Sequence, residues 1–152
     1  MKGFKFTLDP LLRLKGVEKS RIEVELAEHQ RIVSKYVAQI SSENNSISEM
    51  LLEAQMSVEN KHSVSCLLSM PSSISEKKNN IYMLEKKVAE LNKKSQEILG
   101  RLSTKVSELK KVQELKDEQI STYRKKLEKL EQQTREEMYN IQKESKKNRI
   151  GA

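Results

Sequence analysis

The chain has 152 residues and a formal net charge of +7; 34% of its residues are charged and only 4% are aromatic. So few large apolar side chains exclude a sizeable globular core, and the abundance of Glu, Lys, Leu, Gln and Ser is typical of a coiled coil or a long helix. No Walker loop, dinucleotide-binding glycine pattern, cysteine pair, histidine cluster or Ser/Cys-His constellation occurs, so we expect a protein that is not an enzyme and that uses neither metal nor cofactor.

The first helix is predicted to begin at Pro10. Asp9 is a favourable N-cap, and a proline fits the first helical position because its missing amide would have no partner there. Three apolar residues, Phe4, Phe6 and Leu8, precede this start. They form either a lead-in that folds against the first helical turn or a docking peptide.

Residues 22–54 carry a heptad seam, because apolar residues recur there at alternating spacings of four and three. Two polar residues, His29 and Glu43, interrupt the seam. We interpret His29 as a tolerated seam residue rather than as a ligand or a pH sensor, since His62 lies too far along the pattern to complete a metal site with it. The seam consists of Ile22, Leu26, His29, Val33, Tyr36, Ile40, Glu43, Ile47, Met50 and Ala54.

The segment around Pro71 is predicted to be the turn of the fold. A proline inside a helix removes a backbone hydrogen bond and clashes with the preceding turn. Ser73 and Glu76 match a capping box, which marks a helix start. We therefore expect helix one over about 10–68, a turn over about 69–72 and helix two over about 73–147. Because a short connection folds two long helices back on each other, the predicted fold is all-α, a single antiparallel coiled-coil hairpin over residues 1–152.

The second helix has its own heptad seam, with one extra step of four residues near its middle. Its charge complements that of the first helix: residues 22–60 contain two basic and seven acidic residues, and residues 61–140 contain seventeen basic and twelve acidic ones. This difference favours pairing within one chain, so we expect a monomer, with a parallel homodimer as the alternative. The seam is Ile81, Leu84, Val88, Leu91, Ser95, Ile98, Leu102, Lys105, Leu109, Val112, Lys116, Ile120, Tyr123, Leu127 and Leu130.

Both chain ends are basic, and in the hairpin we expect them at one pole. Residues 1–21 carry six basic and two acidic side chains, and residues 141–152 carry four and one. At 1.5 Å per residue, helix two would span roughly 110 Å and helix one roughly 90 Å. Helix two should therefore extend past helix one, which leaves Met138 and Ile141 exposed unless residues 4–8 cover them. An exposed apolar tip beside basic residues is a candidate binding site.

Other partners and compartments are disfavoured by the sequence. The basic residues form no continuous stripe and are not interleaved with aromatic residues, so we expect no nucleic-acid binding. No apolar run approaches the roughly 20 residues of a membrane span, and residues 1–6 lack the apolar stretch of a signal peptide. The single cysteine, Cys66, excludes an intrachain disulfide and fits a reducing cytoplasm, where we read it as a small apolar residue near the turn.

Several short motifs occur in an order that is informative. The chain opens with FKFTLDPLLRLK at residues 4–15, and KVQELK follows at residues 111–116. Tyr123, Leu127 and the Glu131-Gln132 pair come next, and then Glu136-Glu137. In this order the motifs resemble those of the FliJ family of bacterial flagellar type III export proteins, which commonly open with F-x-F-x-L-x-x-L-L-x-L-K. The family often has Asp-Glu where this chain has Glu136-Glu137.

The resemblance implies a cytoplasmic protein that associates peripherally with the inner membrane through the flagellar export apparatus. Members of the family are antiparallel coiled coils similar to the two-helix part of the rotary ATPase gamma subunit. They insert the terminal pole into the pore of the hexameric export ATPase and promote ring assembly. They also contact the cytoplasmic linker region of the large export-gate membrane protein, and have been described as escorts for export chaperones.

From the resemblance we derive two sets of candidate contact residues. Contact with the ATPase pore is assigned to Phe6, Leu8, Leu11, Leu12, Met138 and Ile141. Contact with the export gate is assigned to Tyr36, Ile81, Tyr82 and Leu84, although Leu84 is also a seam residue and core packing is its stronger reading. The alternative functions are the equivalent stalk of a virulence type III secretion system, and a generic coiled-coil spacer or nucleic-acid-binding adaptor.

Overall fold

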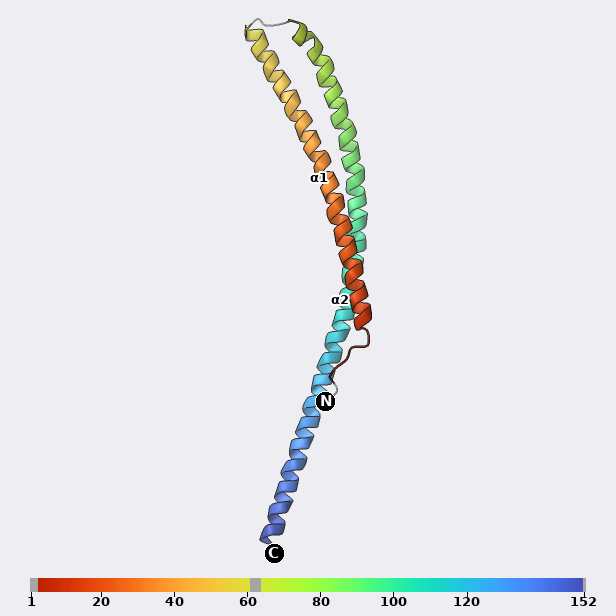
Figure 1. Cartoon of the computed structure of the whole chain (residues 1–152), viewed down its shortest axis with the longest axis vertical. Helices are drawn as coiled ribbons and strands as arrows, with labels where there is room; N and C mark the ends of the chain where they lie inside the picture. Colours follow the sequence, from red (N-terminus) through yellow and green to blue (C-terminus); the bar gives the residue numbers. More distant parts are fainter. Residues whose placement is uncertain (1–2, 61–63, 152) are drawn as a thin grey trace. The chain divides into compact units, whose positions relative to one another are not determined.

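The protein is an all-α helical hairpin, as the sequence predicts (Figure 1). A computed structural model describes residues 3–60 and 64–151. Helix α1 comprises Asp9–Asn60 and helix α2 comprises Val64–Ile150. The two helices pack against each other, and no strand occurs in either described range.

Residues 18–104 form one compact unit, which we call the hairpin unit. Within it α1 and α2 run antiparallel, because residue numbers fall along α2 as they rise along α1. Near the start of the unit Glu25 accepts a hydrogen bond from Arg101 at 2.7 Å, and further along α1 Glu43 accepts one from Lys77 at 3.0 Å. Both ion pairs join the acidic α1 to the basic α2, in the sense that the charge pattern predicts.

Residues 1–17 and 105–152 form a second compact unit, the terminal unit. Here too the helices are antiparallel: Lys15 contacts Glu108, and Asp9 contacts Lys116. Helix α2 continues beyond these contacts, and every described residue from 128 to 151 is exposed. The overhang that the sequence predicts is therefore confirmed, with a length of roughly 36 Å at 1.5 Å per residue.

The predicted seams form the core. All ten predicted seam residues of α1 are buried or half-buried, and so are those of α2 from Ile81 to Leu127. Only Leu130, the last predicted member, is exposed, because it lies where α2 has no partner helix. The core is thin, as expected for two helices. Its buried apolar residues are Phe6, Ile22, Ile47, Ile81 and Ile98.

The predicted position of the turn is wrong. Helix α1 ends at Asn60 rather than near residue 68, and α2 begins at Val64, so Pro71 lies inside α2 and Ser73 does not cap a helix start. Residues 61–63, including His62, lie outside the described part of the chain. At its other end α2 reaches Ile150 instead of residue 147.

Packing explains why α2 continues through Pro71. Leu67, Met70 and Ile74 are half-buried and keep the three- and four-residue spacing that leads to the buried Ile81. Together with Leu51 of α1 they line a shallow apolar groove. A helix-interior proline costs about 3 kcal/mol relative to alanine. Full burial of a large apolar side chain contributes about 1.5–3 kcal/mol, so the partial burial of these three side chains together is of the same size as that cost.

Candidate functional site

The apolar lead-in, residues 4–8, folds onto α2 in the terminal unit. Phe6 is the most buried side chain in the described part of the protein, with 3% of its surface exposed. Its carbonyl oxygen accepts a hydrogen bond from the Asp9 amide at 3.3 Å, which turns the chain into α1. Of the two sequence-based alternatives, the structure is closer to a folded lead-in, although the lead-in packs on α2 rather than on the first turn of α1.

Lys116 of α2 connects the lead-in to the start of α1. Its Nζ atom donates to Asp9 Oδ1 at 2.7 Å and lies 5.7 Å from the centroid of the Phe6 ring. We call Phe6, Asp9 and Lys116 the clip. Helix α1 begins at Asp9, one residue before the predicted start, and the Leu8 carbonyl accepts the first helical hydrogen bond from the Leu12 amide, so Asp9 is not the N-cap. One ammonium group thus contacts both the carboxylate of the first residue of α1 and an aromatic face, two arrangements that each favour a positive charge.

A pair of aromatic rings extends the contact along α2. The rings of Phe4 and Tyr123 lie 5.5 Å apart, with an angle of 49° between their planes. These two residues also line a shallow groove with Glu118, Thr122 and Lys126. Residues 4–8 therefore cover the seam of α2 from about residue 116 to residue 123.

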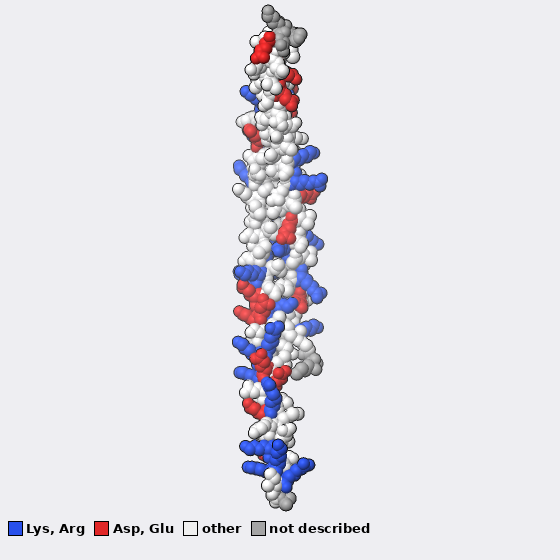
Figure 2. Space-filling model, turned by 90° about the vertical axis from the view of Figure 1, so that its left-hand side faces the viewer, with Lys and Arg blue, Asp and Glu red and all other residues white. Residues whose placement is uncertain are grey.

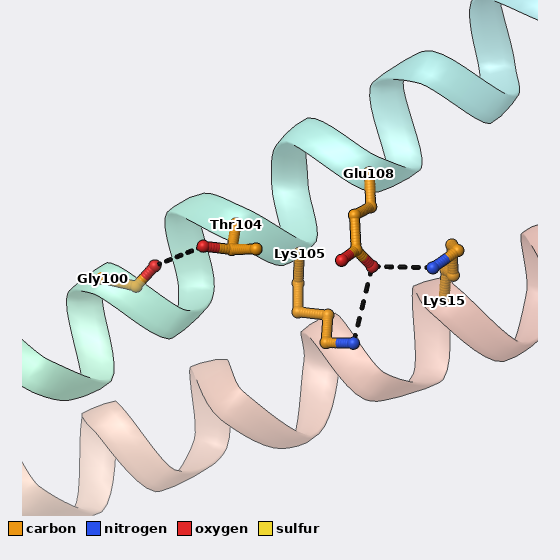
Figure 3. A network of polar contacts seen from close by, with 5 residues as sticks. All are labelled: Lys15, Gly100, Thr104, Lys105 and Glu108. Carbon is orange, nitrogen blue, oxygen red and sulfur yellow. Dashed lines mark hydrogen bonds and ion pairs between the residues drawn. The ribbon is translucent and has the colours of Figure 1, made fainter.

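A second polar cluster fixes the register of the two helices in this unit (Figure 3). Glu108 Oε2 accepts a hydrogen bond from Lys15 Nζ at 2.7 Å across the helix pair and lies 3.5 Å from Lys105 Nζ on its own helix. The hydrogen bond from Lys15 and the positive charge of Lys105 hold the pKa of the Glu108 carboxyl below its ordinary value.

Acidification should therefore weaken the terminal unit through Glu108. A carboxyl whose pKa is lowered by folding stabilises the folded state above its unfolded pKa, and this contribution is lost as pH falls through the folded pKa. We expect Glu108→Gln to lower the melting temperature at neutral pH, with a difference from the wild type that shrinks as the pH falls below the ordinary pKa of a glutamate and through the lower folded pKa. Thermal unfolding across this pH range tests the expectation, and a difference independent of pH would contradict it.

The six residues assigned to the ATPase pore do not form one surface. Phe6 is buried by the clip and is not available to a partner, which corrects its assignment as a contact residue. Leu8 and Leu12 are half-buried, and Leu11 is just exposed. Met138 and Ile141 are widely exposed on the overhang. Phe4 contacts Tyr123, and Tyr123 and Met138 are separated by 15 residues, or roughly 22 Å of helix, so residues 4–8 do not reach the exposed tip.

The four residues assigned to the export gate lie in the hairpin unit, in two different environments. Ile81 is buried and Leu84 is half-buried, as their seam positions predict. Tyr82 is exposed, and Lys86 Nζ lies 4.6 Å from the centroid of its ring. Tyr36 is half-buried on α1, and Lys87 Nζ of α2 lies 5.4 Å from its ring centroid. Of these four residues only Tyr82 is exposed.

A surface groove beside these residues was not predicted from the sequence. It runs between α1 and α2 and is lined by Gln39, Ser42, Glu43, Asn80, Met83, Leu84, Lys86, Lys87 and Glu90. Met83 is exposed there although it is large and apolar. The four-residue spacing of Tyr82 and Lys86 is the one signal that could have revealed part of this surface, because such residues are neighbours on a helix.

His29 acts as a structural seam residue. Its Nε2 atom lies 2.8 Å from the carbonyl oxygen of Leu91 on α2. Because a carbonyl oxygen only accepts, Nε2 carries the proton and donates it. Within residues 3–60 and 64–151 no three His, Cys, Asp or Glu side chains gather in a way that could hold a metal ion. Cys66 is exposed in the first turn of α2.

Comparison with known proteins gives no match: no protein-family model, no curated protein and no solved structure is significantly similar to this chain. Neither helix, over its described residues, contains a stretch apolar enough to cross a lipid bilayer. The candidate function therefore depends on the short sequence motifs and on the surfaces described above.

Proposed function

We propose that this protein is a non-enzymatic stalk and regulator of the flagellar type III export apparatus. In this proposal the terminal unit binds the hexameric export ATPase, and the hairpin unit binds the cytoplasmic linker region of the export gate. The protein would also escort export chaperones, and would be a cytoplasmic protein held at the inner membrane by these partners. The observation that carries the proposal is the overhang of α2, residues 128–151, which is exposed on all sides.

The overhang has the dimensions and charge of a segment that enters a protein pore. A single helix with its side chains is roughly 10–12 Å wide, much thinner than a helix pair. Lys and Arg side chains gather toward the C-terminal end of α2 (Figure 2), where residues 141–152 contain four basic residues and one acidic residue. Met138 and Ile141 add exposed apolar surface to the same segment.

The hairpin unit offers a separate surface for the export gate. Tyr82 and Met83 are exposed beside Lys86, and the groove between α1 and α2 adjoins them. Aromatic residues are enriched at energetically important positions of protein interfaces, whereas isolated exposed leucines are common everywhere on surfaces. We therefore move the proposed gate contact from Ile81 and Leu84, which belong to the core, to Tyr82 and its exposed neighbours.

The test is the ATPase activity and ring assembly of the flagellar export ATPase, with and without this protein. We expect stimulation that saturates near one molecule per hexamer. Leu11→Asp should abolish the stimulation and leave the helical circular dichroism signal unchanged, because Leu11 lies at the surface of the first turns of α1. Val24→Asp, at an exposed position of α1 in the hairpin unit, is the matched control and should stimulate like the wild type.

Two results would redirect the proposal. Stimulation of a virulence-type export ATPase alone would assign the chain to that related system. No stimulation of either ATPase, with the helices folded, would leave a spacer or a nucleic-acid-binding adaptor, and nucleic-acid binding would weaken steeply with added salt.

A further inference from the structure

The apolar seam of α2 continues into the overhang, where no part of α1 or the lead-in covers it. Upstream, Ile120, Tyr123 and Leu127 belong to the same seam and are half-buried. Downstream the seam is exposed, and Met138 has 63% of its surface accessible. Four residues spaced by four, four and three positions share this face, and we call them the open stripe: Leu130, Thr134, Met138 and Ile141.

Acidic residues border the open stripe. Neighbours on a helix surface are three or four positions apart. By this spacing Glu131, Glu137 and Glu144 each adjoin at least one member of the stripe, whereas Lys129, Lys143 and Lys147 adjoin none. The net positive charge of the overhang therefore lies mainly on its other faces.

Two basic residues depart from this pattern. Lys126 lies four positions before Leu130 and so borders the first member of the stripe. Arg135 lies three positions before Met138 and so borders the stripe on one side. Its Nε atom donates to the backbone carbonyl of Glu131 at 3.2 Å. Three carboxylates against two basic side chains leave the border of the stripe with a net negative charge.

A second copy of this chain is a poor occupant for the open stripe. Two overhangs packed through their stripes would bring together two borders that are each net negative, with three glutamates against two basic residues. In coiled coils the residues that flank the seam select the partner, and like charges there disfavour pairing. A helix with basic flanks would instead form ion pairs on both sides of the seam.

We propose that the open stripe docks one helix of another protein, whose apolar seam is flanked by Lys or Arg. This helix would extend the two-helix packing of the terminal unit beyond the lead-in, because the stripe is the direct continuation of the seam that α1 and the lead-in cover. The inference deepens the proposed function, on which it rests only for the identity of the protein that supplies the helix.

The experiment uses the full chain and two synthetic helical peptides of about three heptads each. Both peptides carry the same Leu and Ile seam; one has Lys at every flanking position and the other has Glu. Binding is measured by the fluorescence anisotropy of a labelled peptide. We expect the Lys peptide to bind at least about tenfold more tightly than the Glu peptide at low salt, with a difference that narrows as salt screens the flanking charges.

Two variants at adjacent positions locate the binding face. Met138→Asp should abolish binding of the Lys peptide, because it places a charge in the centre of the stripe. Tyr139→Asp is the matched control: Tyr139 is 66% exposed but adjoins no member of the stripe, so this variant should bind like the wild type. Since both positions are exposed, circular dichroism should show unchanged helicity for both.

Several outcomes would overturn the inference. Equal binding of the two peptides would refute the charge selection, and equal binding by the two variants would refute the location. A dimer in analytical ultracentrifugation that Met138→Asp dissociates would make a second copy the occupant. Peptide binding is measured separately from ATPase stimulation. If the protein stimulates the ATPase but binds both peptides equally, only the proposal of a docked helix is refuted. Discrimination without stimulation refutes only the proposed function.

Discussion

Replacing Phe6 with alanine should lower the free energy of unfolding of the terminal unit by about 3 kcal/mol. Phe6 is the most buried side chain among the described residues, and it lies against the Lys116 ammonium group. Truncation leaves the space of the ring empty, because a two-helix structure has no further side chains that could move in to fill it. The lead-in also loses the side chain that makes its most buried contact with α2. Urea unfolding measures the loss, and hydrogen exchange should show faster exchange in the first turn of α1.

Phe4→Ala is the matched control for Phe6→Ala. Phe4 is half-buried, and the ring contact it makes with Tyr123 is worth about 1 kcal/mol, so its truncation should cost far less. Equal losses for the two variants would contradict the burial of Phe6. If Phe6→Ala also loses ATPase stimulation, we attribute the loss to loosening of the clip, because a buried ring does not contact the pore directly.

The helix-packing part of the fold could be predicted from the sequence because it depends on a local repeat. Positions three and four residues apart share a helix face whatever the rest of the chain does. The seam of α1 from Ile22 to Ala54 is therefore correct at every position, including the polar His29 and Glu43. Leu130 is exposed because it lies beyond the part of α2 that α1 and the lead-in cover. The spacing of apolar residues does not show where that covered part ends.

The candidate site depends on contacts between residues far apart in the sequence, and these were not predictable from spacing. Nothing in the pattern shows that Lys116, at a seam position, would bind Asp9 across the helix pair and contact the Phe6 ring. Without that contact Phe6 looks like an exposed lead-in residue available to a partner. The overhang was predictable because it follows from helix lengths alone, even though the predicted turn was misplaced.

The turn was misplaced because the prediction relied on the local effect of proline on a helix and did not consider the packing of α2 against α1. Proline usually ends a helix, and Ser73 and Glu76 supply a plausible new start. The spacing of Leu67, Met70 and Ile74 continues across Pro71, and it indicates that one helix face persists there. That signal was present in the sequence, and it predicts the structure better than the capping motif does.

Pro71→Ala should therefore raise the free energy of unfolding of the hairpin unit, by as much as about 3 kcal/mol. In α2 the missing amide of Pro71 leaves the carbonyl of Leu67 without its helical partner, and alanine restores that hydrogen bond. Thermal unfolding measures the gain. Hydrogen exchange should localise it, with slower exchange in the first turns of α2.

The control is the other proline of the chain. Pro10 occupies the first turn of α1, where a backbone amide has no helical partner, so Pro10→Ala should change stability by a few tenths of a kcal/mol. If the chain turned at Pro71 instead, alanine would restore no helical bond, and it would lose the rigidity that proline gives to a turn. Unchanged or lower stability of Pro71→Ala would then place the turn at residues 69–72, whereas a gain confined to this variant supports one helix from Val64 onward.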